Sequence, residues 1–336
     1  AGGAACRVVT ATGNTIPQIT SMSNNGVSIP ISTPFTLSAT ASDADGDNIT
    51  YNWEEWDLGP ATTWNGGNAN TTSPLFKSRI PKVSGNRTFP DITVIQQNYP
   101  VNPAATMGGL KGETLPTRAR PMKFRLTVRD NRTGGGGVTT GGDGCQTGFT
   151  TPFVVNVVGT APFTVTVPNG GESYEGSTSQ TVTWNVSGTN AAPINTATVK
   201  ISLSTDGGLT YPTVLLASTA NDGSEAVSIP NTVTTTARIK VEAIGNIFFD
   251  VSNANFTITA ATSGFDFSSP VATTISCNAV ATADVSLATT SIGGYVVPVL
   301  LSATAGVPAG TTVSFNPASV VPGNSSIVTL NNTNTL

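Results

Sequence analysis

The chain has 336 residues, of which 10% are charged, and a formal net charge of -4. Its length allows two or three domains, and its 35 glycines and 22 prolines favour short strands joined by turns over long helices. A nucleic-acid-binding surface is excluded because no tract of clustered Lys and Arg is present.

Residues 1-160 form the first predicted domain, a PKD- or cadherin-like β-sandwich that carries an insertion at residues 59-121. Residues 34-41 alternate apolar with small polar side chains, and Ile49, Tyr51 and Trp53 share one face of the next apolar segment. This alternation predicts two neighbouring strands of a sandwich.

An acidic turn at residues 42-48 joins these two strands. Asp43, Asp45 and Asp47 stand at alternate positions and supply the hard oxygen ligands that calcium takes, while Gly46 allows a sharp turn. Asp and Gly are also ordinary turn formers, and the segment lacks the long loop and bidentate Glu of an EF-hand. A calcium site and a plain turn both remain open.

The insertion is dense in Pro, Asn, Thr and Gly, and within it residues 74-77 and 92-95 could form short edge strands. A loop of this length is normally functional or packed on its host. Trp56 and Trp64 flank its start and could stack against sugars. The alternative is that Trp56 packs the insertion against the sheet.

The predicted strand at residues 122-130 returns to the sheet, and residues 153-157 close the domain. In an immunoglobulin-like sandwich the second-to-third-strand loop and the penultimate hairpin lie at the same end. We therefore expect Asp130 and Asn131 to approach the acidic turn. Crowded carboxylates repel one another unless a cation neutralises them, which adds Asp130 to Asp43, Asp45 and Asp47 as a predicted calcium ligand.

Residues 161-261 form the second predicted domain, an immunoglobulin- or fibronectin-like sandwich. Residues 163-167, 181-186 and 199-203 alternate as strands do, with Trp184 expected in the core. Asp206-Gly207 indicates a hairpin, and Asp250 is expected in a turn. Further strands complete a spacing typical of this sandwich.

Residues 262-336 are the third predicted unit, a partial or small immunoglobulin-like module. Residues 296-301, 311-315 and 326-330 have β character. These are few strands for a complete sandwich, so either the module is small or the natural chain continues.

Three cysteines, Cys6, Cys145 and Cys277, lie far apart without the spacing of a zinc site. A Cys6–Cys145 disulfide would tie the two ends of the first domain together and would suit an oxidising compartment. Buried free thiols are the alternative.

The most apolar run, residues 295-307, is too short to span a bilayer and contains Pro298, so we expect no membrane span. The chain begins at Ala1 without a signal peptide, and we expect a processed or truncated piece of a longer protein. Its low charge and its many Thr, Ser and Asn residues are typical of an extracellular β-rich protein.

The sequence contains no histidine. Ser-His-Asp and Cys-His catalysis and His-ligated zinc are therefore excluded within this chain. A carboxylate pair for glycoside hydrolysis would have to come from Glu54, Glu55, Asp57 and Glu113. Glu54 and Glu55 are neighbours on a strand and point to opposite faces, so we expect no enzyme activity.

Several short sequence segments follow one another along the chain in a characteristic order. They lie at residues 29-37, 43-47, 50-60, 74-78, 112-117, 124-131, 167-172, 181-184, 203-208, 237-241 and 248-252. This ordered set covers about residues 6-260. It resembles the region that follows the catalytic domain in secreted reprolysin-like (metzincin) zinc metalloproteases of the Bacteroidetes type.

The resemblance implies a zinc protease domain upstream, immunoglobulin-like modules here and, often, a sorting domain for type 9 secretion. The His-Glu-x-x-His zinc motif is absent, so no catalytic residue can be assigned from the family. We expect a non-catalytic accessory or spacer region, secreted or at the cell surface, whose partner is the protease domain, an extracellular protein or a glycan. The alternative is a surface adhesin or carbohydrate-binding β-sandwich that uses Trp56 and Trp64.

Overall fold

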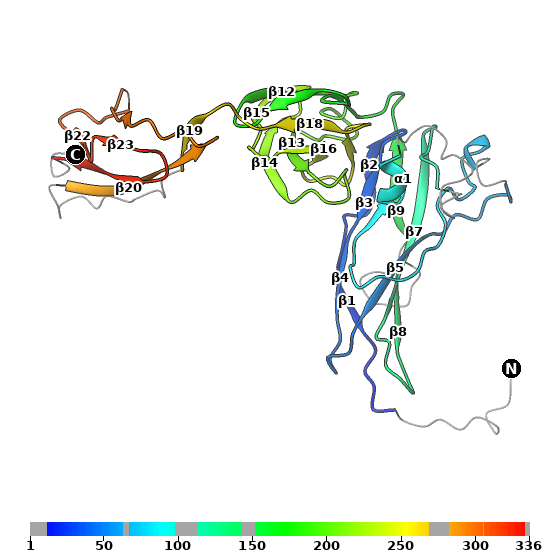
Figure 1. Cartoon of the computed structure of the whole chain (residues 1–336). Helices are drawn as coiled ribbons and strands as arrows, with labels where there is room; N and C mark the ends of the chain where they lie inside the picture. The colour runs from blue at the N-terminus through cyan, green and yellow to red at the C-terminus, as the bar shows by residue number, and fades with distance from the viewer. Residues whose placement is uncertain are drawn as a thin grey trace, which may run out of the picture. The chain divides into compact units, whose positions relative to one another are not determined.

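The computed structural model describes residues 12-62, 67-97, 113-142, 152-268, 282-304 and 306-332 (Figure 1). The regular secondary structure of these residues is almost entirely β-strand, which confirms the predicted all-β fold of tandem sandwich modules. The chain divides into two compact units, and the first contains most of the described residues up to Ile258. Three sets of sheets follow one another along the chain, here called the first, second and third modules.

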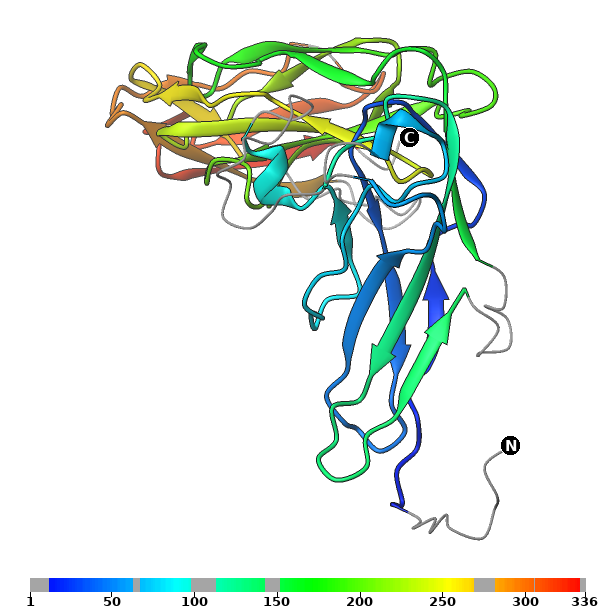
Figure 2. The ribbon, with the colours of Figure 1, turned by 90° about the vertical axis from the view of Figure 1, so that its right-hand side faces the viewer.

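The first module contains strands β1 to β9. Their bounds are β1 Gln18–Met22, β2 Val27–Pro30, β3 Phe35–Leu37, β4 Ala39–Ser42, β5 Thr50–Glu55, β6 Arg87–Phe89, β7 Arg120–Arg129, β8 Val138–Gly141 and β9 Phe153–Val158. One sheet has the order β2-β9-β7-β5 with β8 also paired to β7, and the remaining strands pair as β1-β4 and β3-β6. Figures 1 and 2 show the early blue strands running beside the green strands β7 to β9.

Aromatic side chains form the centre of this module because alternate strand residues point inward. Phe35 stacks on Phe89 with ring centroids 5.1 Å apart, and Trp53 meets Phe153 edge to face at 5.5 Å. The predicted strands at residues 34-41, 49-53 and 122-130 are thereby confirmed, although a break divides the first of them into β3 and β4.

The insertion differs from its prediction at residues 92-95. Ile92–Ile95 form a short helix, α1, instead of an edge strand. The Asp91 side chain caps it by accepting a hydrogen bond from the backbone N–H of Thr93 at 3.1 Å. Residues 74-77 form no strand either: Phe76 makes only an isolated bridge to Glu113. A 3-10 helix, η2 Gly67–Ala69, completes the regular structure described in the insertion.

Part of the insertion covers the edge of β5. The backbone N–H of Tyr51 donates to the carbonyl of Lys82 at 2.7 Å, and Lys82 returns the bond at 3.0 Å. Exposed sheet edges are sites of unwanted pairing, and this contact closes one of them.

The second module contains strands β10 to β18. Their bounds are β10 Thr164–Val167, β11 Ser173–Glu175, β12 Ser179–Asn185, β13 Thr198–Ser204, β14 Thr213–Ala220, β15 Ser224–Ser228, β16 Thr234–Ala243, β17 Phe249–Val251 and β18 Phe256–Thr259. The sheets have the orders β10-β12-β15 and β11-β18-β16-β13-β14, with β17 also paired to β16. Trp184 is buried in the core, as predicted, and donates from Nε1 to Asn221 Oδ1 at 2.9 Å.

Asp250 corrects a prediction in this module. It lies in the buried strand β17 and not in a turn, and its Oδ2 accepts the backbone N–H of Val165 at 2.7 Å. The short strand could not be recognised from Phe249-Asp250-Val251 alone, because a charged residue at a buried strand position contradicts the usual alternation. Burial raises the pKa of Asp250 to about 7.

The first two modules share direct contacts within one compact unit. Thr36 donates its backbone N–H to the carbonyl of Ile247 at 2.9 Å, and Phe249 donates to the carbonyl of Pro34 at 3.0 Å. The insertion also contributes to the contact between these two modules, because Ile95 of α1 packs in a small apolar cluster with Phe249 and Val251.

The third module contains strands β19 to β24. Their bounds are β19 Gly264–Phe267, β20 Thr282–Ile292, β21 Val299–Leu300, β22 Thr312–Asn316, β23 Ser319–Val320 and β24 Ser325–Asn331. The order β19-β20-β24-β22 forms one sheet, and β21 pairs with β23. β20 was not predicted, because its run of Ala, Ser and Thr carries little apolar alternation.

Candidate metal centre

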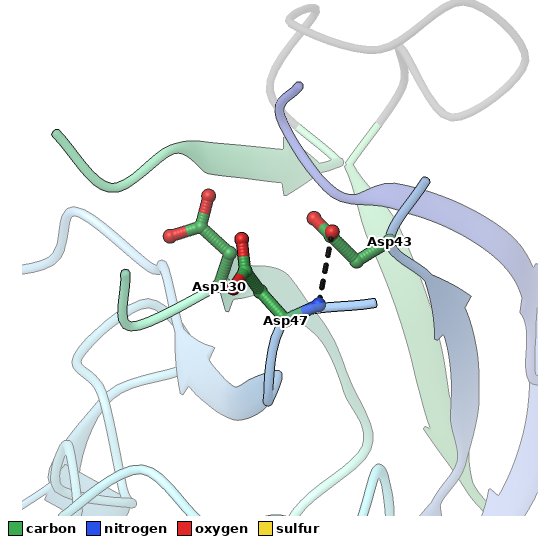
Figure 3. A group of neighbouring side chains, drawn as sticks. All are labelled: Asp43, Asp47 and Asp130. Atoms are coloured by element: carbon green, nitrogen blue, oxygen red, sulfur yellow. Dashed lines mark hydrogen bonds between the residues drawn. The ribbon is translucent and has the colours of Figure 1, made fainter. Parts of the chain in front are cut away.

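Three carboxylates meet at one end of the first module. Asp43 and Asp47 come from the turn between β4 and β5, and Asp130 follows β7 directly. One carboxylate oxygen of each lies within 4.8 Å of those of the other two, and Figure 3 shows the three side chains beside one another. The sandwich topology therefore brings together residues that are more than eighty positions apart in the sequence.

Asp43 organises the turn on which the cluster is built. Its Oδ1 accepts the backbone N–H groups of Asp45 at 2.9 Å and of Asp47 at 3.2 Å. Gly46 has a φ of 79°, a conformation that glycine adopts without steric cost. These hydrogen bonds and the positive φ of Gly46 define the shape of the turn.

Asp130 is almost fully buried, with 1% of its surface exposed. It accepts hydrogen bonds from Asn14 Nδ2 at 2.6 Å and from the backbone N–H groups of Gly137 at 2.6 Å and Arg132 at 3.2 Å. The Asn14 bond, followed by the backbone bonds, lowers the pKa of Asp130 despite its burial. It is therefore a carboxylate at neutral pH.

The glycine run after Asp130 has a steric explanation. A Cβ on Gly136 would stand 2.8 Å from Asp130 Oδ1, and a Cβ on Gly137 would stand 2.9 Å from Oδ2. Both positions allow the loop to approach the carboxylate closely.

Two oxygens of the cluster have no hydrogen-bond donor among the described residues. Asp43 Oδ2 and Asp47 Oδ2 are buried and without a hydrogen-bond partner. The positive charge nearby is Arg132, whose Nη1 lies 3.7 Å from Asp47 Oδ2 and 3.5 Å from Asp45 Oδ2. Three carboxylates, two of which have an oxygen without a hydrogen-bond donor, are a donor set that suits a calcium ion, while Arg132 provides part of the charge balance by itself.

Asp45 lies apart from the three-carboxylate cluster. Its Oδ2 accepts the backbone N–H of Thr15 at 2.6 Å and pairs with Arg132. Asn131, which was expected nearby, donates from Nδ2 to the carbonyl of Asn48 at 2.8 Å. Sequence reasoning missed Asn14 and Arg132, because nothing local marks a residue that completes a site from another segment.

Of the two tryptophans predicted to bind sugars, Trp56 is half-buried and Trp64 lies outside the described residues, as do Cys6 and Cys145. The Arg125 guanidinium carbon lies 5.4 Å from the centroid of the Trp56 ring. This contact covers part of one ring face.

The carboxylates considered for glycoside chemistry are engaged in structural contacts. Glu54 pairs with Arg125 at 3.1 Å, and the buried Glu113 pairs with Arg79 at 2.7 Å and Arg87 at 3.0 Å. None of these pairs leaves a carboxylate facing another across an open cleft in the described part of the chain.

Glu55 is also held by the fold. Its Oε2 accepts the backbone N–H groups of Leu75 at 2.6 Å and Phe76 at 2.8 Å, which ties the insertion to β5. Burial, followed by the neighbouring Asp57, raises the pKa of Glu55 to about 8. Arg120 donates to Asp57 at 3.2 Å and lies 3.7 Å from Glu55, so one guanidinium serves two carboxyl groups.

Comparison with known proteins places the chain near no family. No family model and no curated protein matches it. Within the described residues, no helix has the length and apolar character required to cross a bilayer.

Solved structures match the chain, among them structures of immunoglobulin and FN domains. A structure concerned with Dscam isoform specificity has 11% identity over 73% of this chain and 46% of its own, with a TM-score of 0.21. The FN1–FN3 domains of chicken CNTN1 have 12% identity over 72% and 65%, with a TM-score of 0.23. Sidekick-1 immunoglobulin domains 1–5 have 8% identity over 95% and 53%, with a TM-score of 0.20.

This chain thus spans roughly half to two thirds of those chains. The fold assignment rests on the strand pairing described above. None of the comparisons links the chain to a metalloprotease.

Proposed function

We propose that the chain is a non-catalytic, extracellular accessory region that spaces and positions a catalytic domain, that of a secreted zinc metalloprotease. The observation that carries this proposal is the coupling of the first two modules. Backbone hydrogen bonds join β3 to the segment before β17, and the insertion helix α1 packs against β17. A spacer that orients its cargo requires modules that do not move independently.

The second support is the use of the carboxylates. Glu54 and Glu55 fasten the insertion to β5, and Glu113 joins two parts of the insertion to each other, instead of lining an open cleft. The insertion therefore serves the architecture, and the long loop is packed on its host.

The coupling can be tested by measuring whether the first two modules tumble together. In the full chain, 15N relaxation should give one rotational correlation time for both. Ile95→Ala removes the α1 contact with Phe249 and should separate the two correlation times, whereas Ile80→Ala, at a position 86% exposed, should not. Independent tumbling in the unaltered chain would contradict the spacer role.

The accessory role has its own test. The isolated chain should hydrolyse no casein or peptide library, and it should keep a fused reporter enzyme at the producing cell's surface. Measurable proteolysis, or a reporter that is retained equally well without the chain, would rule the proposal out.

The second candidate is a surface adhesin or carbohydrate-binding protein, which Trp56 favours because this residue is only half-buried. A glycan array with the Trp56→Ala and Trp64→Ala variants separates the two functions. A spacer shows no selective binding, whereas an adhesin shows binding that either substitution reduces.

We also propose that calcium stiffens the first module at Asp43, Asp47 and Asp130. The oxygens of Asp43 and Asp47 that lack a hydrogen-bond donor, together with the buried, ionised Asp130, support this site. Calcium should raise the melting temperature relative to EDTA, and Asp130→Asn should abolish the rise. Asp45→Asn is the matched control and should retain it. An unchanged melting temperature in the unaltered chain would show that the cluster is a plain turn.

A further inference from the structure

A second polar site lies in the first module, away from the carboxylate cluster. A cavity of about 120 Å³ is bounded by β5 on one side and by the insertion on the other. Trp53, Arg79, Lys82, Asn86, Arg87 and Asp91 are among its lining residues. Three of these are cationic and one is anionic.

The cations around this cavity outnumber their partners. The buried Glu113 carboxylate accepts from Arg79 Nε at 2.7 Å and from Arg87 Nη2 at 3.0 Å, so one negative charge serves two guanidinium groups. Lys82 Nζ lies 3.9 Å from Asp91, and these two balance each other. Glu54, another carboxylate close by, pairs with Arg125. One positive charge therefore remains without a counter-charge.

The excess charge coincides with an unused hydrogen-bond donor. Arg79 Nη2 is buried and has no hydrogen-bond partner among the described residues. Arg87, by contrast, donates to the carbonyls of Trp53 and Lys77 as well as to Glu113. Leaving a charged donor unpaired in a buried position costs free energy, so the arrangement favours an acceptor from outside, which a rotation of the Arg79 side chain, itself 21% exposed, would bring to the guanidinium group.

We propose that this cavity binds the carboxylate group of a small organic acid or of a uronic-acid residue, with Arg79 as the principal donor. A carboxylate is planar and matches the fork of a guanidinium group. The cavity volume corresponds to a few water molecules, which occupy about 30 Å³ each in the liquid. The cavity therefore has room for a carboxylate group and the few atoms bonded next to it. Lys82, whose side chain is 69% exposed, stands where it can add a second attraction from the rim.

This site is independent of the spacer role and of the calcium site. The cluster at Asp130 lies outside it, and its proposed donors Arg79 and Lys82 take no part in the contacts between the modules, although Ile92 of α1 borders both the cavity and the apolar cluster with Phe249.

NMR titration of the 15N-labelled full chain tests the site. Sodium acetate or sodium glucuronate is added, and sodium chloride keeps the ionic strength constant. The signal followed is the Trp53 indole N–H, which donates to the Gly85 carbonyl at 3.0 Å. Saturable shifts of this signal are expected with both acids. Shifts that grow linearly, or that chloride and sulfate reproduce, would overturn the proposal.

Variants assign the binding to the cavity. Arg79→Gln should abolish saturable binding, and Lys82→Gln should weaken it about 5-fold, as the loss of roughly one charge-assisted contact predicts. Lys77→Gln is the control, because Lys77 is exposed and does not line the cavity. If Arg79→Gln does not fold, equal affinities of Lys82→Gln and Lys77→Gln would still refute the site.

An oligogalacturonate arm identifies the source of the carboxylate. Affinity well above that of monomeric glucuronate, lost with the same variants, identifies an acidic polysaccharide as the ligand. Equal affinity per carboxylate identifies a small acid. Both results support a carboxylate site, whereas binding of the oligomer that is insensitive to Arg79 and Lys82 contradicts it.

Discussion

The first and second modules hold their long connections in different ways. The insertion of the first module is fastened by the carboxyl groups of acidic side chains, with Glu113 between two arginines and Glu55 against the backbone of residues 75-76. The connection between β12 and β13 in the second module is held by the neutral Asn221, which donates to Thr189 Oγ1 at 2.8 Å and to the Thr196 carbonyl at 2.9 Å. A buried carboxylate can accept hydrogen bonds from several donors of a long loop at once. When one partner is removed, however, the remaining buried charge is unpaired, and the free energy of unfolding falls.

The largest effect is expected from breaking the charged centre. Glu113→Ala leaves Arg79 and Arg87 without their carboxylate and should lower the free energy of unfolding by about 3–5 kcal/mol. Urea denaturation measures it. Glu54→Ala, which removes a partly exposed partner of Arg125, should cost about 1 kcal/mol or less. Equal losses for the two variants would contradict the structural role of Glu113.

The next effect is the pH dependence of stability. The pKa of Glu55 is raised to about 8 and that of Asp250 to about 7, so the folded chain binds more protons than the unfolded chain between about pH 4 and pH 8. Stability should therefore fall as the pH rises through this window, by about 2 kcal/mol or more between pH 5 and pH 8.

Glu55→Gln and Asp250→Asn remove these two titrations. Each should flatten the pH profile of the free energy of unfolding, and Glu55→Gln should flatten it more at the alkaline end because its pKa is higher. A profile that rises from pH 5 to pH 8 in the unaltered chain would show that both groups are ionised when folded.

The neutral network of the second module should be less sensitive. Asn221→Ala removes the acceptor of the Trp184 indole and two donated bonds, and a loss of about 1–3 kcal/mol is expected. Asn185→Ala is the control, since Asn185 is exposed and bonds only Thr164 by its side chain. If Asn221→Ala exceeds Glu113→Ala in cost, the contrast between the modules is wrong.

The smallest effect concerns charges at the surface of the second module. Lys200 pairs with Glu242 at 2.8 Å, and Lys240 holds the same carboxylate at 2.7 Å. Lys200→Ala should change the free energy of unfolding by less than about 1 kcal/mol and should do so less at high salt. A larger loss would place these surface charges on a par with the buried ones.

Sequence patterns predicted much of the sheet structure, because apolar alternation with a period of two is a local property. They located β5, β7, β13 and β16. The expected immunoglobulin-like topology then predicted that Asp130 lies close to the acidic turn. They failed at α1, where the β-branched residues Ile92–Ile95 favour a strand. Ile95 is buried there against Phe249 and Val251 of the second module, a contact that no local pattern reveals.

The carboxylate cluster shows the same limit. Asp45 matches Asp43 and Asp47 in spacing, yet it turns to Thr15 and Arg132, which the alternate-residue pattern does not include. Likewise Glu55 and Arg120 are ordinary surface residues by type, and only the fold of the insertion buries them together.

The pairing of β2 with β9 has a mechanical consequence. Of the strands in the main sheet of the first module, β2 is the first and β9 the last in the sequence. They are neighbours in the sheet and run parallel, with Val27 opposite Val155 and Pro30 opposite Val158. A pull on the two ends of the module in opposite directions slides one strand along the other, so the hydrogen bonds between them carry the load together instead of opening one at a time. We expect a module built in this way to resist extension under force, which would serve the proposed spacer role.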